Sequence, residues 1–137
     1  MKLTRQDLIW EELGRADESL NMAKLALEAQ YWNSAAVELY YTCYYFIQAL
    51  FLALDVQAHT HAGMKSLFSQ KFIKEYLIDK TYAKLLGQLF IYRQEGNYGG
   101  YKVTKEAIMP YQKEVESFKT AVLALLQQLG YKINNES

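Results

Sequence analysis

Apolar residues recur every three or four positions along most of the chain, which is the spacing of one face of an α-helix. The first stripe begins at Ile9, and Thr4 before it is a suitable N-cap, with Asp7 favouring the positive end of the helix dipole. The stripe consists of Ile9, Leu13, Ala16, Leu20, Ala23 and Leu27. This pattern predicts a long N-terminal helix.

The next stretch is apolar on two adjacent helical faces. One face carries Ala36, Leu39, Cys43, Phe46, Leu50 and Ala53, and the neighbouring face carries Tyr40, Tyr44, Ile47, Phe51 and Leu54. A helix with two apolar faces either lies in the middle of a bundle or shares one face with a second chain. We expect a homodimer, with the tyrosines of this helix as its seam.

Further helices follow, and their limits are marked by polar and glycine residues. The predicted limits are about His61 to Tyr76, then Asp79 to the glycines at 96, 99 and 100, and then Thr104 to Gly130 with a restart at Pro110. With one proline and seven glycines, almost the whole chain is free to be helical. The predicted fold class is therefore all-α, an up-and-down bundle of four to five helices.

Composition limits the domain organisation and the location. A chain of 137 residues with 51% hydrophobic residues has enough apolar material for one domain, which we expect over residues 1–130, followed by a frayed tail over 131–137. The single cysteine, Cys43, excludes an intramolecular disulfide and a cysteine-based zinc site. The longest uncharged run, Leu39 to Leu54, is short for a membrane span. We expect a cytoplasmic protein with no membrane segment and no cofactor.

Charge is unevenly distributed along the chain, although 15 basic and 15 acidic side chains balance overall. Residues 1–61 carry four basic and eight acidic side chains, whereas residues 62–113 carry nine basic and four acidic ones, a net charge of +5. This basic part would attract an acidic partner or a phosphate backbone. The alternative is a solvated surface with no ligand.

Arg93 breaks the apolar pattern of its helix. Extending the stripe of Leu86 and Leu89 by four positions reaches Arg93, so a guanidinium stands where an apolar side chain would enter the bundle. A guanidinium is suited to carboxylates and phosphates, and burying it without a partner is costly. Arg93 therefore either pairs with a glutamate, such as Glu38 or Glu12, or contacts a phosphate or RNA.

Polar residues around Arg93 extend this candidate site. Asn97 shares a helical face with Arg93 if the helix survives Gly96, and Tyr98 follows directly. Lys102 and Lys105 lie shortly after, so we expect Arg93, Lys102 and Lys105 to bind nucleotide or RNA. Any catalysis would use Arg93, Asn97 and Tyr98.

The two histidines, His59 and His61, stand beside Thr60 at the start of a predicted helix. A His-x-His pair can hold a metal on an extended segment, but a metal site normally needs three or four ligands, and no other ligand cluster accompanies this pair. We therefore expect no metal site, and expect His61 to pack or to cap a helix.

The order of several motifs resembles that of the small stand-alone bacterial HEPN domains. The motifs are Ala35-Ala36-Val37-Glu38-Leu39-Tyr40-Tyr41, His61-Ala62-Gly63, Leu67-Phe68-Ser69-Gln70-Lys71-Phe72 and Arg93-Gln94-Glu95-Gly96-Asn97-Tyr98-Gly99. The resemblance covers residues 5 to 129. It implies a helical bundle that dimerises, and a role as a metal-independent ribonuclease toxin or as the partner of a minimal nucleotidyltransferase in a toxin–antitoxin pair.

The chain departs from that family in the motif of its ribonuclease members. Those members carry an arginine followed four to six residues later by a histidine, and here Tyr98 occupies the position five after Arg93. The branch that this chain most resembles has an Arg-x3-Asp-Tyr motif, in which the aspartate is replaced here by Asn97. By resemblance, Tyr98 is also a candidate for modification by a partner nucleotidyltransferase.

Three functional hypotheses follow from these residues. The first is a dimeric HEPN-type protein of a toxin–antitoxin or defence system, with a degenerate catalytic motif, that binds nucleic acid, nucleotide or a nucleotidyltransferase. The second is an active metal-independent ribonuclease, which the sequence disfavours because a tyrosine of ordinary pKa is a poor base at neutral pH and no histidine follows Arg93. The third is a helical interaction scaffold.

Overall fold

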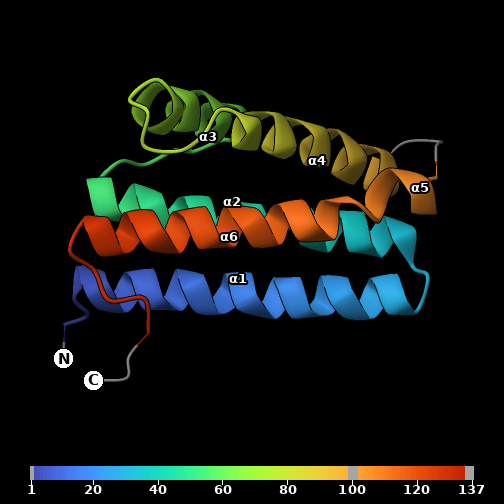
Figure 1. Cartoon of the computed structure of the whole chain (residues 1–137), viewed down its shortest axis with the longest axis horizontal. Coiled ribbons are helices and arrows are strands. Elements are labelled where there is room, and N and C mark those ends of the chain that lie inside the picture. The colour runs from blue at the N-terminus through green and yellow to red at the C-terminus, as the bar shows by residue number, and fades with distance from the viewer. Residues whose placement is uncertain (1, 99–101, 135–137) are drawn as a thin grey trace.

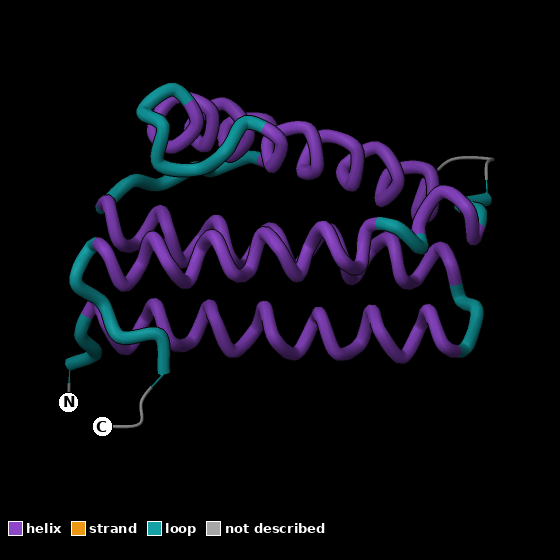
Figure 2. The backbone as a smooth tube through the Cα atoms, in the orientation of Figure 1, coloured by secondary structure: helices purple, strands orange, loops and turns teal. Residues whose placement is uncertain are grey.

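The computed structural model describes residues 2–98 and 102–134, with backbone only for residues 95–98. These residues form helices and loops without a strand, which confirms the predicted all-α class (Figure 2). The elements are α1 (Arg5–Glu28), α2 (Trp32–Leu54), α3 (His61–Phe68), the π-helical turn η1 (Ser69–Ile73), α4 (Thr81–Tyr98), α5 (Lys105–Ile108) and α6 (Tyr111–Gln128).

Helix α2 is the centre of the bundle. It packs against α1, α4 and α6, and the four long helices alternate in direction, so the topology is up-and-down (Figure 1). Helices α1 and α4 lie on opposite sides of α2, and the start of α1 and the end of α6 lie at the same end of the bundle (Figure 1). The described connections between the long helices therefore lie at the two ends of the bundle.

Helix α1 begins where its capping residues predict. The Thr4 hydroxyl accepts the Asp7 amide at 3.0 Å, and the Asp7 carboxylate accepts the Thr4 amide at 3.0 Å. This capping box satisfies two amides that a helix start otherwise leaves without a partner. All six residues of the predicted apolar stripe of α1 are buried.

Both apolar faces of α2 are largely covered within the single chain. Most residues of the first face are buried, and Tyr40, Ile47 and Phe51 of the second face are buried as well. Of the two explanations for a helix with two apolar faces, the structure shows the bundle centre. The half-buried residues of α2 include the tyrosine group Tyr41, Tyr44 and Tyr45.

The segment after α2 differs from the single helix predicted from His61 to Tyr76. Helix α3 ends at Phe68, and a π-helical turn follows in which the Lys74 amide bonds the Ser69 carbonyl at 2.9 Å. The chain then reverses at Tyr76, whose φ is +59°. Apolar spacing does not distinguish a π turn from an α-helix, because Phe68 and Phe72 are buried in either case.

Helix α4 passes through Gly96 and ends at Tyr98, which agrees with an end marked by the glycines at 96, 99 and 100. A glycine inside a helix costs only about 1 kcal/mol relative to alanine, so it weakens a helix without ending it. Its start agrees with the prediction near Asp79, whose carboxylate accepts the Thr81 amide at 2.8 Å.

The C-terminal helix is interrupted as predicted. Thr104 caps the single turn α5, Pro110 starts α6, and Gly130 follows the end of α6 with a φ of +96°. Counted as one interrupted helix, α5 and α6 bring the described residues to five helices, within the predicted range.

The chain expected to fray from residue 131 is held at Lys132. Its carbonyl accepts hydrogen bonds from Trp10 Nε1 at 3.0 Å and Gln6 Nε2 at 2.9 Å, and its amide donates to Gln6 Oε1 at 2.8 Å. These bonds tie the end of the chain to α1, so at least Lys132 belongs to the folded unit.

One helix of the described residues, α2, is long and apolar enough to cross a membrane by length and composition alone. Half of its most apolar stretch is buried in the bundle. Because α1, α4 and α6 all pack on it, α2 has the packing of a core helix.

Candidate functional site

Arg93 lies on α4 one turn after the buried Leu89 and is half-buried against α2. Its Nη2 donates to the Tyr41 hydroxyl at 3.0 Å. Its guanidinium carbon is 5.5 Å from the centre of the Tyr40 ring and 5.4 Å from that of Tyr41, within the range of cation–π attraction. The two tyrosines hold the guanidinium at one place between α2 and α4.

Tyr40 connects Arg93 to a histidine from a third helix. The Tyr40 side chain is fully buried, and its hydroxyl forms a 2.5 Å hydrogen bond with Nδ1 of His61. The imidazole and Tyr40 ring centres are 5.6 Å apart. Tyr40 therefore contacts both Arg93 on α4 and His61 at the start of α3.

Other aromatic rings enclose this imidazole. Tyr44 lies 5.6 Å and Phe90 6.1 Å from His61, measured between ring centres. We call Arg93, Tyr40, Tyr41, Tyr44, His61 and Phe90 the Arg93 cluster. It is built from α2, α3 and α4, so it forms only when these three helices pack together.

The local sequence fixes where His61 stands. Thr60, not His61, is the N-cap of α3, and its hydroxyl accepts the Gly63 amide at 2.9 Å. A Cβ on residue 63 would lie 3.0 Å from that hydroxyl oxygen, so glycine suits this tight cap. The cap makes His61 the first residue of the helix and leaves its side chain to pack, which is one of its two predicted roles.

A second cation flanks the cluster. Lys65, one turn after His61, places its ammonium 5.1 Å from the centre of the Phe90 ring. The sequence from α3 to the start of α4 carries four more lysines, at positions 71, 74, 80 and 84, and helices α3 and α4 lie on the side of α2 away from the acidic helix α1 (Figure 1). The Arg93 cluster thus lies between a basic and an acidic side of the molecule.

Burial and charge set the protonation states in the cluster. Burial raises the pKa of Tyr40 well above its ordinary value, and the nearby Arg93 charge only partly opposes this, so the phenol stays protonated at neutral pH. Burial, and then the charge of Arg93, lower the pKa of His61. The cluster therefore combines a cation, a neutral imidazole and a neutral phenol at neutral pH.

The two glutamates considered as structural partners of Arg93 have other neighbours. Glu12 forms an ion pair with Arg15 at 2.5 Å, and Glu38 accepts a hydrogen bond from Ser19. Arg93 instead lies near the rings of Tyr40 and Tyr41 and donates a hydrogen bond to the Tyr41 hydroxyl. A planar guanidinium held in this way presents a rigid fork of N–H donors, the geometry that matches phosphate or carboxylate oxygens.

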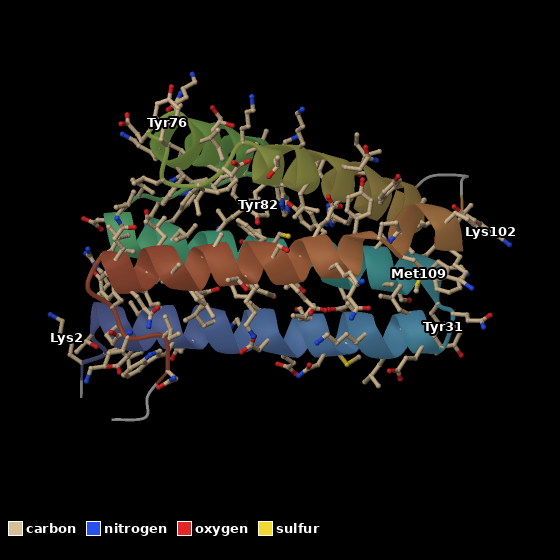
Figure 3. The ribbon with its side chains drawn as sticks, viewed as in Figure 1. Lys2, Tyr31, Tyr76, Tyr82, Lys102 and Met109 are labelled. Carbon is tan, nitrogen blue, oxygen red and sulfur yellow. The ribbon has the colours of Figure 1, made fainter. Side chains whose placement is uncertain are left out.

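The remaining predicted site residues are placed as follows. Asn97 and Tyr98 belong to α4, but their side chains lie outside the described residues. Lys102 and Lys105 are both exposed; Lys105 is the first residue of α5, and Lys102 lies beside the start of α2, at the end of the bundle opposite Tyr76 (Figure 3). Lys102 borders a cavity of about 270 Å³ there, together with Tyr31 and Trp32.

The position of His61 beside this site was not predicted, because a histidine was expected only after Arg93 in the chain. The structure supplies one from 32 positions earlier, through the contact of both residues with Tyr40. Ribonuclease activity was disfavoured because Tyr98 is a poor base and no histidine follows Arg93, and the structure adds that His61 lies in the same cluster as Arg93. The sequence feature that could have indicated that His61 lies near Arg93 was the pair of motifs that contain Tyr40 and His61. Within the described residues, no three His, Cys, Asp or Glu side chains gather as metal ligands.

Comparison with known proteins places the chain among HEPN domains. The HEPN domain family matches residues 9–128. A UPF0332 protein of Thermotoga maritima is 30% identical over 116 residues, covering 84% of this chain and 88% of that protein. The protein named "Putative toxin MJ0605" of Methanocaldococcus jannaschii is 25% identical over 114 residues, covering 83% of this chain and 85% of that protein. Since the family match extends from α1 to the end of α6, the chain belongs to the HEPN domain family, as its ordered motifs indicate.

Proposed function

We propose that this protein binds RNA through a phosphate group held by Arg93, as part of a toxin-type system. The observation that carries the proposal is the guanidinium stacked against Tyr40 and Tyr41 and bonded to the Tyr41 hydroxyl. An arginine that only filled space would not need an aromatic support on two sides. Such support fixes the plane of the fork, which reduces the entropy lost on binding an oxyanion.

Charge favours a phosphate backbone over a single carboxylate. Lys65 lies on the other side of the cluster, and the segment 62–113 around it carries the net charge of +5. A row of cations along α3, η1 and α4 suits a ligand with regularly repeated negative charges. The aromatic residues between the cations add faces on which unpaired bases can stack.

The relatives support the toxin-type assignment. Two similar proteins of Methanocaldococcus jannaschii are named putative toxins, one of which is 25% identical over 61% of this chain. We retain a minimal nucleotidyltransferase as a partner, Tyr98 as a modification site and the cytoplasm as the location. These remain predictions based on the family resemblance.

The protein also acts as a homodimer in this proposal. Met22 and Leu25 on α1 are 50% and 58% exposed, and Met22 borders a groove of about 320 Å³ whose wall includes Tyr41 and Tyr45. Apolar side chains beside half-buried tyrosines are typical of an interface. Because Tyr41 also supports Arg93, a dimer formed on this face would place two Arg93 clusters close to the seam. Sedimentation is expected to give twice the 15.9 kDa chain mass.

A titration of Arg93 variants tests the proposed binding. The probe is a short fluorescein-labelled single-stranded RNA with 2′-O-methyl riboses, which cannot be cleaved through the 2′-oxygen. We expect Arg93→Ala and Arg93→Lys to weaken binding similarly, by about tenfold or more, because lysine keeps the charge but lacks the planar fork. Arg5→Ala is the matched control, since Arg5 is an exposed arginine paired with Asp55 at the other end of the bundle.

Thermal unfolding of the same variants separates binding from folding. If Arg93→Lys binds the RNA as tightly as wild type, Arg93 contributes only its positive charge to binding. Unchanged binding in both variants, together with a much lower melting temperature for Arg93→Ala, would make Arg93 a structural residue and overturn the proposal.

A further inference from the structure

Tyr76 projects from the turn between η1 and α4, on a backbone conformation that tyrosine rarely adopts. We propose that its ring stacks on an unpaired base of the bound RNA, and that the lysines around this turn attract the neighbouring phosphates. The inference rests on the proposed function, because the ligand is the RNA whose phosphate Arg93 holds. It adds a second contact, near the other end of α4 from Arg93.

The turn that presents Tyr76 closes the helical segment formed by α3 and η1. The Leu77 amide donates to the Phe72 carbonyl at 2.9 Å, and the Tyr76 amide donates to the Ile73 carbonyl at 3.0 Å. This pair of bonds is the Schellman motif, in which the residue at the position of Tyr76 is left-handed and is usually glycine. Phe72 and Ile78 are buried on either side of the turn, so the turn is fixed to the bundle.

The same pair of bonds closes three other helices within the described residues. The left-handed residue is Gln30 after α1, Asp55 after α2 and Gly130 after α6. Glycine adopts this conformation freely, and aspartate does so more readily than most residues, whereas bulky side chains rarely do. The φ of +59° at Tyr76 is therefore the outlier of this group.

Folding does not explain the side chain of Tyr76. It is 95% exposed at one end of the bundle, so both faces of its ring are open and it adds almost nothing to the core (Figure 3). Glycine at this position would close the same turn with less strain. An exposed ring on an unfavourable backbone points to a contact with a ligand.

Positive charge surrounds this ring. Residues 71–84 contain four exposed lysines, at positions 71, 74, 80 and 84, and the ion pairs of the described chain include none of them. The acidic residues of this stretch are Glu75 and Asp79, and the Asp79 carboxylate accepts the Thr81 amide at 2.8 Å, at the positive end of α4. The turn therefore attracts the phosphates of a nucleic acid.

A cavity of about 630 Å³ adjoins the ring. Tyr76, Ile73 and Ile78 border it, together with Lys74, Lys80 and the capping carboxylate of Asp79. Its volume is within the usual range of small-ligand pockets, so it can receive a nucleoside. An aromatic ring and lysines around one cavity provide the two contacts that proteins make with single-stranded nucleic acid, base stacking and attraction of the backbone.

The open ring faces favour a single strand, because the bases of a duplex are stacked on one another and leave no face free. A strand that reaches both contacts must follow α4 from Thr81 to Arg93, which is about 18 Å at a helical rise of about 1.5 Å per residue. A stacked strand advances about 3.4 Å per nucleotide, so a probe of 12 nucleotides is long enough.

Fluorescence titrations of the full chain with a fluorescein-labelled, single-stranded 2′-O-methyl RNA of 12 nucleotides test the inference. We expect Tyr76→Leu and Tyr76→Gly to bind about tenfold more weakly than wild type, the usual effect of losing one stacked base. Tyr76→Phe keeps the aromatic face and should bind within about twofold of wild type. Gln30→Gly is the matched control, because it places glycine at the same position of the same motif after α1 and changes no charge.

Thermal unfolding separates the role of the ring from a role in folding. Tyr76→Gly should melt at or above the melting temperature of wild type, because glycine takes the left-handed conformation without strain. A much lower melting temperature for Tyr76→Gly would make Tyr76 a structural residue and overturn the inference.

The outcomes separate the two proposals. Equal binding by wild type, Tyr76→Leu and Tyr76→Gly, with weaker binding by Arg93→Ala, overturns the inference and leaves the proposed function standing; Tyr76 would then face another ligand, such as an acidic segment of a partner protein. An equal loss in Gln30→Gly also overturns it. Binding that Tyr76→Gly weakens and Arg93→Ala does not is the failure of the proposed function alone, and absence of binding by wild type removes both.

Discussion

The two sides of helix α2 are built on different chemistry. The side toward α6 carries Phe46, whose ring meets that of Phe118 in a fully buried contact. The side toward α4 carries Tyr40 and Tyr41, which hold a guanidinium.

This difference is the basis on which we propose that one side of α2 serves stability and the other serves as a ligand site. A phenylalanine cluster is stabilised by burial and packing alone, whereas a half-buried cation costs desolvation and must be held by specific partners. An apolar residue of similar volume at position 93 would fill the same space in the bundle without the desolvation cost of a cation. The presence of Arg93 on the apolar stripe of α4 therefore points to ligand chemistry on that side of α2.

The largest expected effect is on the phenylalanine side. Phe46→Ala removes a fully buried ring that packs edge-to-face on Phe118 at 6.3 Å, and we expect the free energy of unfolding to fall by about 3–5 kcal/mol. Urea denaturation measures this loss. RNA affinity per folded molecule is expected to stay unchanged, and a selective loss of affinity would show that the two sides are not separate.

A smaller change is expected on the tyrosine side. Tyr41→Phe removes the hydroxyl that accepts the Arg93 hydrogen bond at 3.0 Å, and the free energy of unfolding should fall by about 1 kcal/mol. Affinity for RNA should fall several-fold because the Arg93 guanidinium is no longer held in one orientation. Tyr45→Phe is the control on the same helix; an equal loss of affinity there would contradict the role of Tyr41.

The smallest effect is a pH dependence of stability that originates at His61. Its pKa is lower in the folded protein than its ordinary value near 6.5, so the unfolded chain binds the proton more readily. Its contribution to stability is complete above pH 6.5 and is lost as the pH falls from 6.5 toward the folded pKa. Melting curves over this range should therefore show a smaller decline for His61→Gln than for wild type. Equal declines would exclude His61 as the source.

The sequence pattern predicted most of the fold because the ends of most helices are marked by capping or helix-breaking residues close to them. Thr4 with Asp7, Pro110, and Gly130 are signals read within a few residues, and the structure uses each of them. The π turn at Ser69–Ile73 was missed, and the passage of α4 through Gly96 was left open, because both depend on how the rest of the bundle packs.

The site was predictable only in part, for a related reason. Arg93 is visible as an interruption of an apolar stripe, which is a property of one helix. Its link to His61 through Tyr40 joins three helices, and no spacing along the chain contains that information. A prediction confined to residues after Arg93 therefore found the cation and missed the imidazole.

The central claim is that the tyrosine side of α2 is a ligand site, and its most direct test is nuclear magnetic resonance of the Arg93 side chain during a titration with 2′-O-methyl RNA. The Nε–Hε signal is assigned by its disappearance in Arg93→Lys. We predict that this signal and the His61 ring signals shift together and saturate at the RNA concentration that saturates the fluorescence titration. Binding that shifts only the lysines of η1 and the start of α4, while the Arg93 and His61 signals stay in place, would contradict the account.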